Sequence, residues 1–148
     1  QDMLDRTHLI TAYNYSILSK CERAKVGAVI VRDNRIISVG YNGLPANSKC
    51  DCCENEDNTT KDLVVHAERN AIDFAAKYGV SIDGCSLYVT MSPCIKCAIS
   101  IIQSGIKRVV FSEQYRDTQG IETLLDYGIE VNQIEITYKT LKGMTIIK

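Results

Sequence analysis

Two hydrophobic periods run along the first part of the chain and predict its elements. Between residues 3 and 19 apolar side chains recur every three to four positions, as in an amphipathic helix. Residues 26–31 and 35–39 are rich in β-branched side chains and are separated by Arg32-Asp33-Asn34, which is typical of a hairpin turn. Residues 43–62 are polar and follow neither period, so we expect a long loop with a functional role.

The second half of the chain alternates between helical and extended patterns. Helical spacing resumes near Leu63 and continues through Lys77 to a stop at Gly79. The following elements are, in order, a strand at 86–91, a helix after Pro93, a strand at 108–111, a helix at 119–127 and a short strand at 129–131. Residues 134–138 alternate like another strand, and the last ten residues give no firm signal. This order predicts a single α/β domain over residues 1–148, with helices on both faces of a mixed sheet.

Size and charge limit the classes of protein to which the chain can belong. Its 148 residues, 45% of them hydrophobic, suffice for one buried core but not for two domains of ordinary size. The longest apolar stretches are far shorter than the roughly 20 residues that cross a bilayer, and no signal-peptide pattern opens the chain. A net charge of -1 disfavours a nucleic-acid partner. We therefore expect a soluble protein with a small-molecule substrate and no membrane or nucleic-acid partner.

The cysteine content indicates metal binding. Seven cysteines are an odd number without a secretory signal, and two of them stand as Cys94-x-x-Cys97. Metal ligation explains them better than a framework of disulfides, and we expect a reducing, cytoplasmic compartment. Cys85, alone before a strand, is expected to be a small core residue.

Two short motifs carry the candidate chemistry, His66-Ala67-Glu68 and Pro93-Cys94-Ile95-Lys96-Cys97. A Cys-x-x-Cys at a helix N-terminus directs two thiolates at one metal ion, and the positive end of the helix dipole stabilises their charge. Pro93 is suited to such a helix start. His66, at the start of the other helix, would be the third ligand of a tetrahedral Zn2+ ion whose fourth position stays open to water. Three protein ligands indicate a catalytic zinc.

Glu68 is expected to be the general acid and base of this site. Two residues beyond His66, it can lie beside the water without binding the metal. There it would take a proton from water, protonate a ring nitrogen and pass a proton to the departing ammonia, as in zinc-dependent deaminases. The alternative is a closed structural zinc site, in which Glu68 only favours a helix N-terminus. Such a site would need a fourth Cys or His at similar spacing, which His-x-Glu does not supply.

Longer segments around these motifs are distinctive as well. They include Gly40-Tyr41-Asn42-Gly43-Leu44-Pro45 and residues 25–31, 66–72, 88–94 and 103–106. Over about residues 19–131 the chain resembles the deoxycytidylate (dCMP) deaminase family of the cytidine deaminase superfamily, and its phage-type members in particular. The resemblance implies a three-layer α-β-α fold with a five-stranded mixed sheet in the order 2-1-3-4-5. It also implies hydrolytic deamination of dCMP to dUMP, which supplies dTTP synthesis.

The resemblance assigns roles to residues outside the zinc motifs. Asn42 would contact the nucleotide, and Tyr115 would close over it. The main-chain amide of Ala67 and the carbonyl of Ser92 would read the pyrimidine edge. From spacing alone, Asn42 with the following glycine is a common turn dipeptide that ends a strand.

Regulation and assembly are implied by the same resemblance. Tyr41, Asn42 and Gly43 match a segment associated with effector nucleotides, so substrate and effector roles are not separated for this segment. The family likeness implies a homo-oligomer, commonly a hexamer. It also implies activation by dCTP, with Mg2+ accompanying this effector, and inhibition by dTTP.

Three cations are candidates for binding the 5'-phosphate, namely Arg23, Lys25 and Arg116. Arginine is favoured for its bidentate fork. Arg23 is the first choice because it lies just before the strand that leads to the substrate loop. Taken alone, each of the three is more often a solvated surface residue.

A second group of candidate metal ligands consists of Cys21, Cys50, Cys52 and Cys53. A second, structural zinc is a feature of phage-type relatives, although their histidine ligands lie in an insertion that this chain lacks. The alternative is that these cysteines are free loop thiols.

Three other functions share part of the pattern. A tRNA-editing deaminase has the same zinc motifs, but it would be expected to show a basic surface for phosphate contacts. Free-nucleoside cytidine deaminases typically place Cys where His66 stands. A catalytically silent nucleotide sensor would have no chemical reason to keep Glu68. The sequence therefore favours a dCMP deaminase over these three alternatives.

Overall fold

The helices and strands occur in the predicted order. The computed structural model describes residues 1–50, 52–141 and 144–147. In chain order the elements are α1 (Asp2–Ser16), β1 (Gly27–Arg32), β2 (Arg35–Tyr41), α2 (Ala67–Lys77), β3 (Ser86–Met91), α3 (Ile95–Gln103), β4 (Arg108–Glu113), α4 (Gln119–Asp126), β5 (Glu130–Gln133), β6 (Tyr138–Leu141) and β7 (Met144–Ile147). Within these described ranges, no helix has both the length and the apolar character needed to cross a membrane.

Five strands form one mixed sheet in the order β2-β1-β3-β4-β5, which confirms the predicted order. β1 pairs antiparallel with β2 and with β3, whereas β3–β4 and β4–β5 are parallel pairs. Parallel neighbours need a crossover connection, and α3 and α4 supply the two that are required. The carboxyl ends of β3 and β4 therefore lie at one edge, where the Ser92 amide donates to the Glu113 carbonyl oxygen at 2.8 Å.

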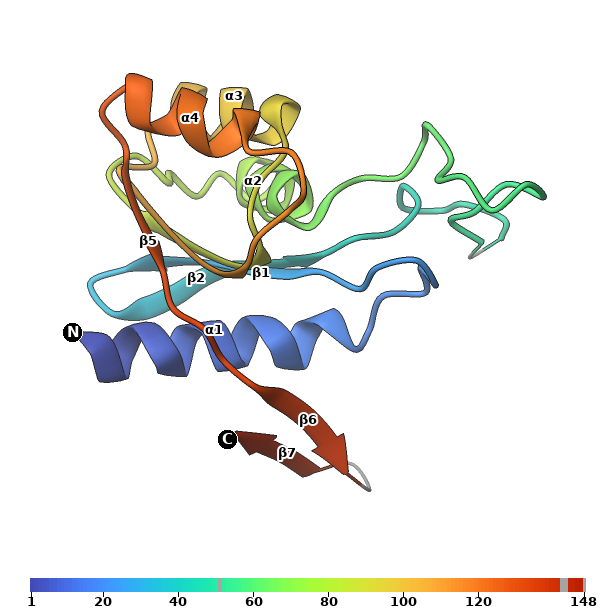
Figure 1. Ribbon diagram of the computed structural model, residues 1–148. Coiled ribbons are helices and arrows are strands. Elements are labelled where there is room, and N and C mark those ends of the chain that lie inside the picture. The colour runs from blue at the N-terminus through green and yellow to red at the C-terminus, as the bar shows by residue number, and fades with distance from the viewer. Residues whose placement is uncertain (51, 142–143, 148) are drawn as a thin grey trace.

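Helices cover both faces of the sheet, α1 on one face and α2, α3 and α4 on the other (Figure 1). The core beneath α1 includes Leu9, Ala12, Val29, Tyr88 and Val110. The core beneath the other helices includes Ala71, Ile101, Leu124, Ile30, Leu87 and Val109. Because successive side chains of a strand point to opposite faces, β1, β3 and β4 each contribute to both cores. The result is the predicted three-layer arrangement.

Two element boundaries in the first half of the chain differ from the prediction. The hairpin loop has two residues rather than three, because β1 continues to Arg32 and both Asp33 and Asn34 have positive φ, as a type I′ turn requires. α2 begins at Ala67 rather than near Leu63. The residues before it are held extended, since Val65 pairs with Gly43 in an isolated antiparallel bridge.

The C-terminal part also differs from the prediction. β5 ends at Gln133, and residues 134–137 are not a strand. Ile136 instead buries its side chain in the core beneath α1. β6 and β7 pair with each other as a separate two-stranded sheet that projects away from the main sheet (Figure 1). The assignment of residues 1–148 to a single domain stays a prediction.

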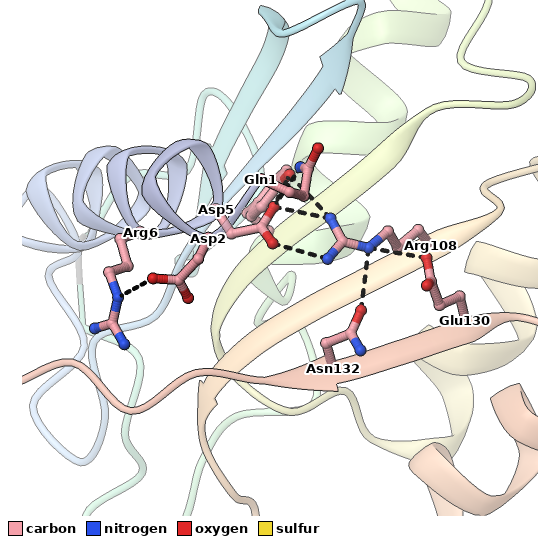
Figure 2. Close-up of polar contacts among 8 residues, drawn as sticks. Gln1, Asp2, Asp5, Arg6, Arg108, Glu130 and Asn132 are labelled. Atoms are coloured by element: carbon pink, nitrogen blue, oxygen red, sulfur yellow. Dashed lines mark hydrogen bonds and ion pairs between the residues drawn. The ribbon is translucent and has the colours of Figure 1, made fainter.

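A buried ion pair fastens α1 to the sheet (Figure 2). The Arg108 guanidinium donates from Nη1 and Nη2 to the two carboxylate oxygens of Asp5, each at 2.8 Å. Tyr88 donates to the same carboxylate at 2.7 Å, and Arg108 Nε lies 2.9 Å from Glu130 and 3.1 Å from Asn132 Oδ1. The hydrogen bonds from Arg108 hold the pKa of Asp5 well below its usual value. One arginine thus joins α1, β4 and β5.

Candidate metal centre and substrate cavity

The predicted zinc ligands come together where two helices begin. His66 is the N-cap residue of α2, Cys94 is the N-cap residue of α3, and Cys97 lies in the first turn of α3. His66 Nδ1 lies 3.5 Å from the sulfur of Cys94 and 3.4 Å from the sulfur of Cys97. The positive ends of both helix dipoles therefore lie beside two sulfur atoms, where they stabilise thiolate charge.

The spacing of these donor atoms fits a zinc ion. Zn–S and Zn–N bonds of ordinary length at tetrahedral angles separate sulfur from nitrogen by about 3.6 Å, close to the two observed distances. The hydrogen bond between the two cysteines lowers the pKa of the Cys94 thiol to about 3 and raises the pKa of Cys97, so the pair shares one proton, which a bound Zn2+ ion would displace. Two sulfurs and one imidazole leave a tetrahedral ion one position for water.

Two glycines allow the close packing that places these ligands. A Cβ on Gly40 would lie 2.4 Å from the carbonyl oxygen of Ala67, so its absence lets β2 approach the first turn of α2. A Cβ on Gly120 would lie 2.1 Å from the carbonyl oxygen of Pro93, so α4 rests directly on the loop before α3. Both contacts are to backbone, and they fix the chain next to His66 and Cys94.

Glu68 lies in the first turn of α2 and is only 4% exposed. Burial raises the pKa of its carboxyl group, because the charged form loses contact with water. It lines the same cavity as His66 and Cys94. A carboxyl group with a raised pKa holds a proton more readily than an ordinary carboxyl group, which suits a general acid and base.

A cavity of about 620 Å³ holds these groups and most of the predicted substrate residues. This volume lies within the usual range for small-molecule sites. Its described lining residues are Cys21, Arg23, Ala24, Val26, Asn42, Glu54, Thr60, Val64, His66, Ala67, Glu68, Met91, Ser92, Cys94, Gln114, Tyr115 and Arg116. Of the three candidate phosphate ligands, Arg23 and Arg116 line it. Lys25 is not among these residues and donates instead to the carbonyl oxygen of Ser19.

The residues predicted to hold the pyrimidine edge and to close over the ring, Ala67, Ser92 and Tyr115, all line this cavity. Ala67 is fully buried, and Ser92 is 4% exposed. The Ser92 hydroxyl accepts a hydrogen bond from the Tyr115 amide at 2.6 Å. Ser92 thereby ties the segment that carries Tyr115 and Arg116 to the loop that carries Cys94. The roles of Ala67, Ser92 and Tyr115 in binding a nucleotide stay predictions.

Only one residue of the segment predicted to bind an effector is among the described lining residues of the cavity. Asn42 lines the cavity, whereas Tyr41 and Gly43 are not among its described lining residues. The Tyr41 amide donates to Asn70 Oδ1 at 3.2 Å, and the Gly43 amide donates to the Val65 carbonyl at 3.1 Å. An effector role for Tyr41, Asn42 and Gly43 stays a prediction.

Sequence reasoning missed three polar residues of the cavity. Thr60 Oγ1 accepts a hydrogen bond from Arg23 at 3.3 Å, and Glu54 and Gln114 also line the wall. Glu54 and Thr60 belong to the long polar loop that was expected to serve a function. No motif distinguishes them from the other polar residues of that loop, because their position depends on how the loop folds back.

Two of the four cysteines of the second candidate metal site come together. Cys21 and Cys53 form a disulfide with an S–S distance of 2.03 Å, so they are not the free thiols of the alternative. Their sulfur atoms also lie within 4.8 Å of a carboxylate oxygen of Glu54, and a second zinc site stays a prediction. Cys50 and Cys52 are exposed free thiols. The long loop folds back over the segment before β1, where the Glu22 amide donates to Glu54 at 3.1 Å, and this brings the two bonded cysteines together.

Two other cysteine predictions have different outcomes. Cys85 is buried in the core beneath α2, α3 and α4, which confirms it as a core residue. The predicted reducing compartment is not tested by the structure and stays a prediction.

Known proteins resemble this chain over most of its length. ComE operon protein 2 of Bacillus subtilis (strain 168) is 40% identical over 141 residues, covering 92% of this chain and 71% of that protein. The deoxycytidylate deaminase of Enterobacteria phage T4 is 38% identical over 168 residues, covering 84% of this chain and 86% of that protein. A crystal structure of dCMP deaminase from the cyanophage S-TIM5 in complex with dCMP and dUMP has a TM-score of 0.88 and 40% identity, covering 90% of this chain and 98% of that one.

The family comparison covers the metal centre itself. Residues 4–113 match the model of the cytidine and deoxycytidylate deaminase zinc-binding region. This range contains the three metal donors and Glu68, together with β1, β2, β3 and β4. The match spans more than half of the chain and agrees with the donor geometry described above. The chain therefore belongs to the cytidine and deoxycytidylate deaminase family.

Proposed function

We propose that this protein hydrolytically deaminates dCMP to dUMP and ammonia. The observation that carries the proposal is one cavity lined by the buried Glu68 with the zinc donors His66 and Cys94, and also by Arg23 and Arg116. The first set of groups suits attack on an aminopyrimidine, and the second suits a 5'-phosphate. The named activity of the phage T4 relative and the nucleotides in the cyanophage structure support the same substrate.

The chemical step follows from the placement of Glu68. Zinc bound by His66, Cys94 and Cys97 would supply a water molecule whose pKa is lowered toward neutrality. Glu68 takes one proton from that water and delivers it to the ring nitrogen next to the attacked carbon. It then takes the remaining proton from the hydroxyl group added to that carbon and passes it to the departing amine, which leaves as ammonia while the carbonyl forms. Its burial keeps bulk water away from the carboxyl group, so the proton returns to the substrate.

Recognition of the nucleotide is divided among separate parts of the cavity wall. The amide of Ala67 and the carbonyl of Ser92 hold the pyrimidine edge, and Tyr115 closes over the ring. Arg23 and Arg116 bind the phosphate, for which their planar forks provide paired donors. The near-neutral net charge of -1 agrees with a free mononucleotide rather than a long nucleic acid.

Regulation and assembly form the second part of the proposal. The family likeness supports a homo-oligomer, commonly a hexamer, that is activated by dCTP with Mg2+ and inhibited by dTTP. In that setting the dUMP produced supplies dTTP synthesis in the cytoplasm, that of the host if the gene is viral. Ammonia release measured with each effector, with and without Mg2+, tests the regulation, and light scattering at matched protein concentrations tests the assembly.

Glu68→Gln tests the catalytic assignment. The amide keeps the size of the side chain but cannot take up a proton, so we expect turnover of dCMP to fall by roughly 100-fold or more. Zinc content, measured by elemental analysis, should remain that of the parent protein because Glu68 is not a ligand. A zinc-loaded, folded variant that retains turnover would show that Glu68 does not carry the proton.

The parent protein provides the substrate test. Ammonia release from dCMP, deoxycytidine and a tRNA anticodon stem is compared at equal enzyme concentration. Faster release from dCMP than from either alternative supports the proposed substrate. Zinc without ammonia release from any of the three would indicate a structural zinc site or a silent nucleotide sensor.

A further inference from the structure

Asn42 is bonded to the segment before β1 through its side chain and its backbone. Its side-chain Oδ1 accepts from the Val26 amide at 2.9 Å, and its Nδ2 donates to the Ala24 carbonyl at 2.8 Å. Its backbone amide donates to the Val26 carbonyl at 3.2 Å, and its backbone carbonyl accepts from the Ser19 hydroxyl at 2.8 Å. Four hydrogen bonds therefore join one residue after β2 to the 19–26 segment.

These bonds continue the sheet beyond its last strand pair. Gly27 of β1 faces Tyr41 of β2, so Val26 and Asn42 are the next pair along the ladder. The carboxamide then reaches two residues further along the segment, to the carbonyl of Ala24. A carboxamide of this length is suited to the task, because Asp lacks the donor for the Ala24 carbonyl and Gln is one carbon longer. Asn42 is only 9% exposed, so these bonds are largely protected from water.

The 19–26 segment carries the cation that enters the cavity. Arg23 lines the cavity, whereas Lys25 on the same segment bonds to Ser19. The Arg23 side chain is exposed and donates to the neutral hydroxyl of Thr60 at 3.3 Å. An exposed arginine with a single weak bond is held poorly by its own contacts. The backbone of the 19–26 segment therefore sets the point from which Arg23 reaches the cavity.

We infer that Asn42 is a positioning residue, which fixes the 19–26 segment so that Arg23 meets the nucleotide phosphate and thereby sets the preference for dCMP over the free nucleoside. The inference rests on the proposed function. It differs from the role expected from the sequence, in which Asn42 itself contacts the nucleotide. A loosened segment would leave the metal centre and Glu68 in place, since neither bonds to Asn42.

Asn42→Ala is the central variant, because it removes the two side-chain bonds without adding charge to the cavity. The KM for dCMP should rise roughly tenfold or more, the size expected when a charge-assisted contact is lost, while kcat changes much less. The ratio of kcat/KM for dCMP to that for deoxycytidine should fall by the same factor. If Asn42 instead contacts the deoxyribose, kcat/KM falls by the same factor for both substrates. The ratio then stays that of the parent, which would overturn the inference.

A double-mutant cycle with Arg23 tests whether the effect passes through that arginine. Arg23→Gln alone should lower the substrate ratio. Adding Asn42→Ala to Arg23→Gln should lower it no further, because the residue being positioned is already gone. Additive losses in the double variant would show that Asn42 acts on the substrate independently of Arg23.

Two more variants complete the experiment. Asn70→Ala is the matched control. Asn70 Oδ1 also accepts a hydrogen bond from a backbone amide, but that amide belongs to Tyr41 and not to the 19–26 segment. Its substrate ratio should stay within roughly twofold of the parent, below the effect of one hydrogen bond. Ser19→Ala removes the bond from the Ser19 hydroxyl to the Asn42 carbonyl and the bond that the same hydroxyl accepts from the Cys21 amide. Both bonds hold the 19–26 segment, and Ser19 is not among the described lining residues, so the variant should lower the ratio in the same direction as Asn42→Ala. It keeps the test valid if Asn42→Ala fails to fold.

The proposed function and the inference fail in distinguishable ways. Absence of dCMP turnover by the zinc-loaded parent overturns the proposed function. Turnover by the parent, with an unchanged substrate ratio in Asn42→Ala and Ser19→Ala, overturns the inference alone. Zinc content and circular dichroism of every variant show that the compared proteins are folded and loaded.

Discussion

Replacing Asp5 by Asn should destabilise the fold by far more than a typical surface change. The substitution keeps the size of the side chain but removes the charge that faces Arg108. Asp5 and Arg108 have side-chain exposures of 4% and 14%, so the remaining guanidinium would be left with little water around it. Figure 2 shows that Glu130 and Asn132 remain as its partners.

The expected magnitude follows from this burial. Removing one partner of a buried ion pair costs about 3 to 5 kcal/mol. Glu130 stays 2.9 Å from Arg108, although its side chain is 64% exposed and its attraction is weakened by water. We therefore expect a loss near the lower limit, about 3 kcal/mol in the free energy of unfolding.

Asp2→Asn is a matched control on the same helix. Asp2 and Arg6 lie 2.9 Å apart, but their side chains are 70% and 49% exposed. Removing this pair should cost less than about 0.5 kcal/mol. The Asp2 and Asp5 variants therefore make the same chemical change at exposed and buried positions of α1.

Urea unfolding at equal protomer concentration measures both losses. Because the pKa of Asp5 is lowered in the folded state, its contribution is present above the unfolded value of 3.8 and is lost as the pH falls below it. The difference in the free energy of unfolding between the parent and Asp5→Asn should therefore become smaller as the pH is lowered below 3.8. Equal losses for the Asp2 and Asp5 variants at pH 7 would refute the argument from burial.

Two further predictions concern the pH dependence and the disulfide. His8 is 6% exposed, and burial lowers the pKa of its imidazole, so the unfolded chain binds this proton more readily. The urea midpoint of the parent should therefore fall as the pH drops below about 6.5, and less so for His8→Phe; parallel curves would contradict this. Cys21→Ser opens a loop of 32 residues and should lower the free energy of unfolding by about 3 to 4 kcal/mol, measured without reductant. Cys52→Ser, at an exposed free thiol, is the control, and equal losses would contradict the assigned pairing.

The sheet and the metal donors could be predicted because their signals are local. β-branched runs and helical spacing mark the elements of the three-layer fold, and the family likeness supplied the strand order. His66, Cys94 and Cys97 are recognisable because each stands in a motif that places it at a helix start. The general acid and base, Glu68, is fixed by its distance from His66 along the same helix.

Features that depend on distant partners could not be predicted. Asn42 looks like a turn residue or a ligand contact in sequence, and its bonds to Ala24 and Val26 require the hairpin to be folded. α2 begins later than predicted because Val65 pairs with Gly43, a contact with a distant segment that the helix propensity of residues 63–66 does not reveal. The disulfide between Cys21 and Cys53 depends on how a long loop folds back, which has no periodic signal.

The two N-cap positions at the metal centre give zinc a second role. Helix starts are ordinarily stabilised by a Ser, Thr, Asp or Asn side chain that bonds to the first amides, with a contribution of about 1 kcal/mol. At α2 and α3 these positions are held by His66 and Cys94, which make no such bond. A zinc ion bound by His66, Cys94 and Cys97 would instead join the starts of the two helices through their N-cap side chains. Loss of this link would loosen the helix turn that carries Glu68, so zinc would serve the fold as well as the reaction.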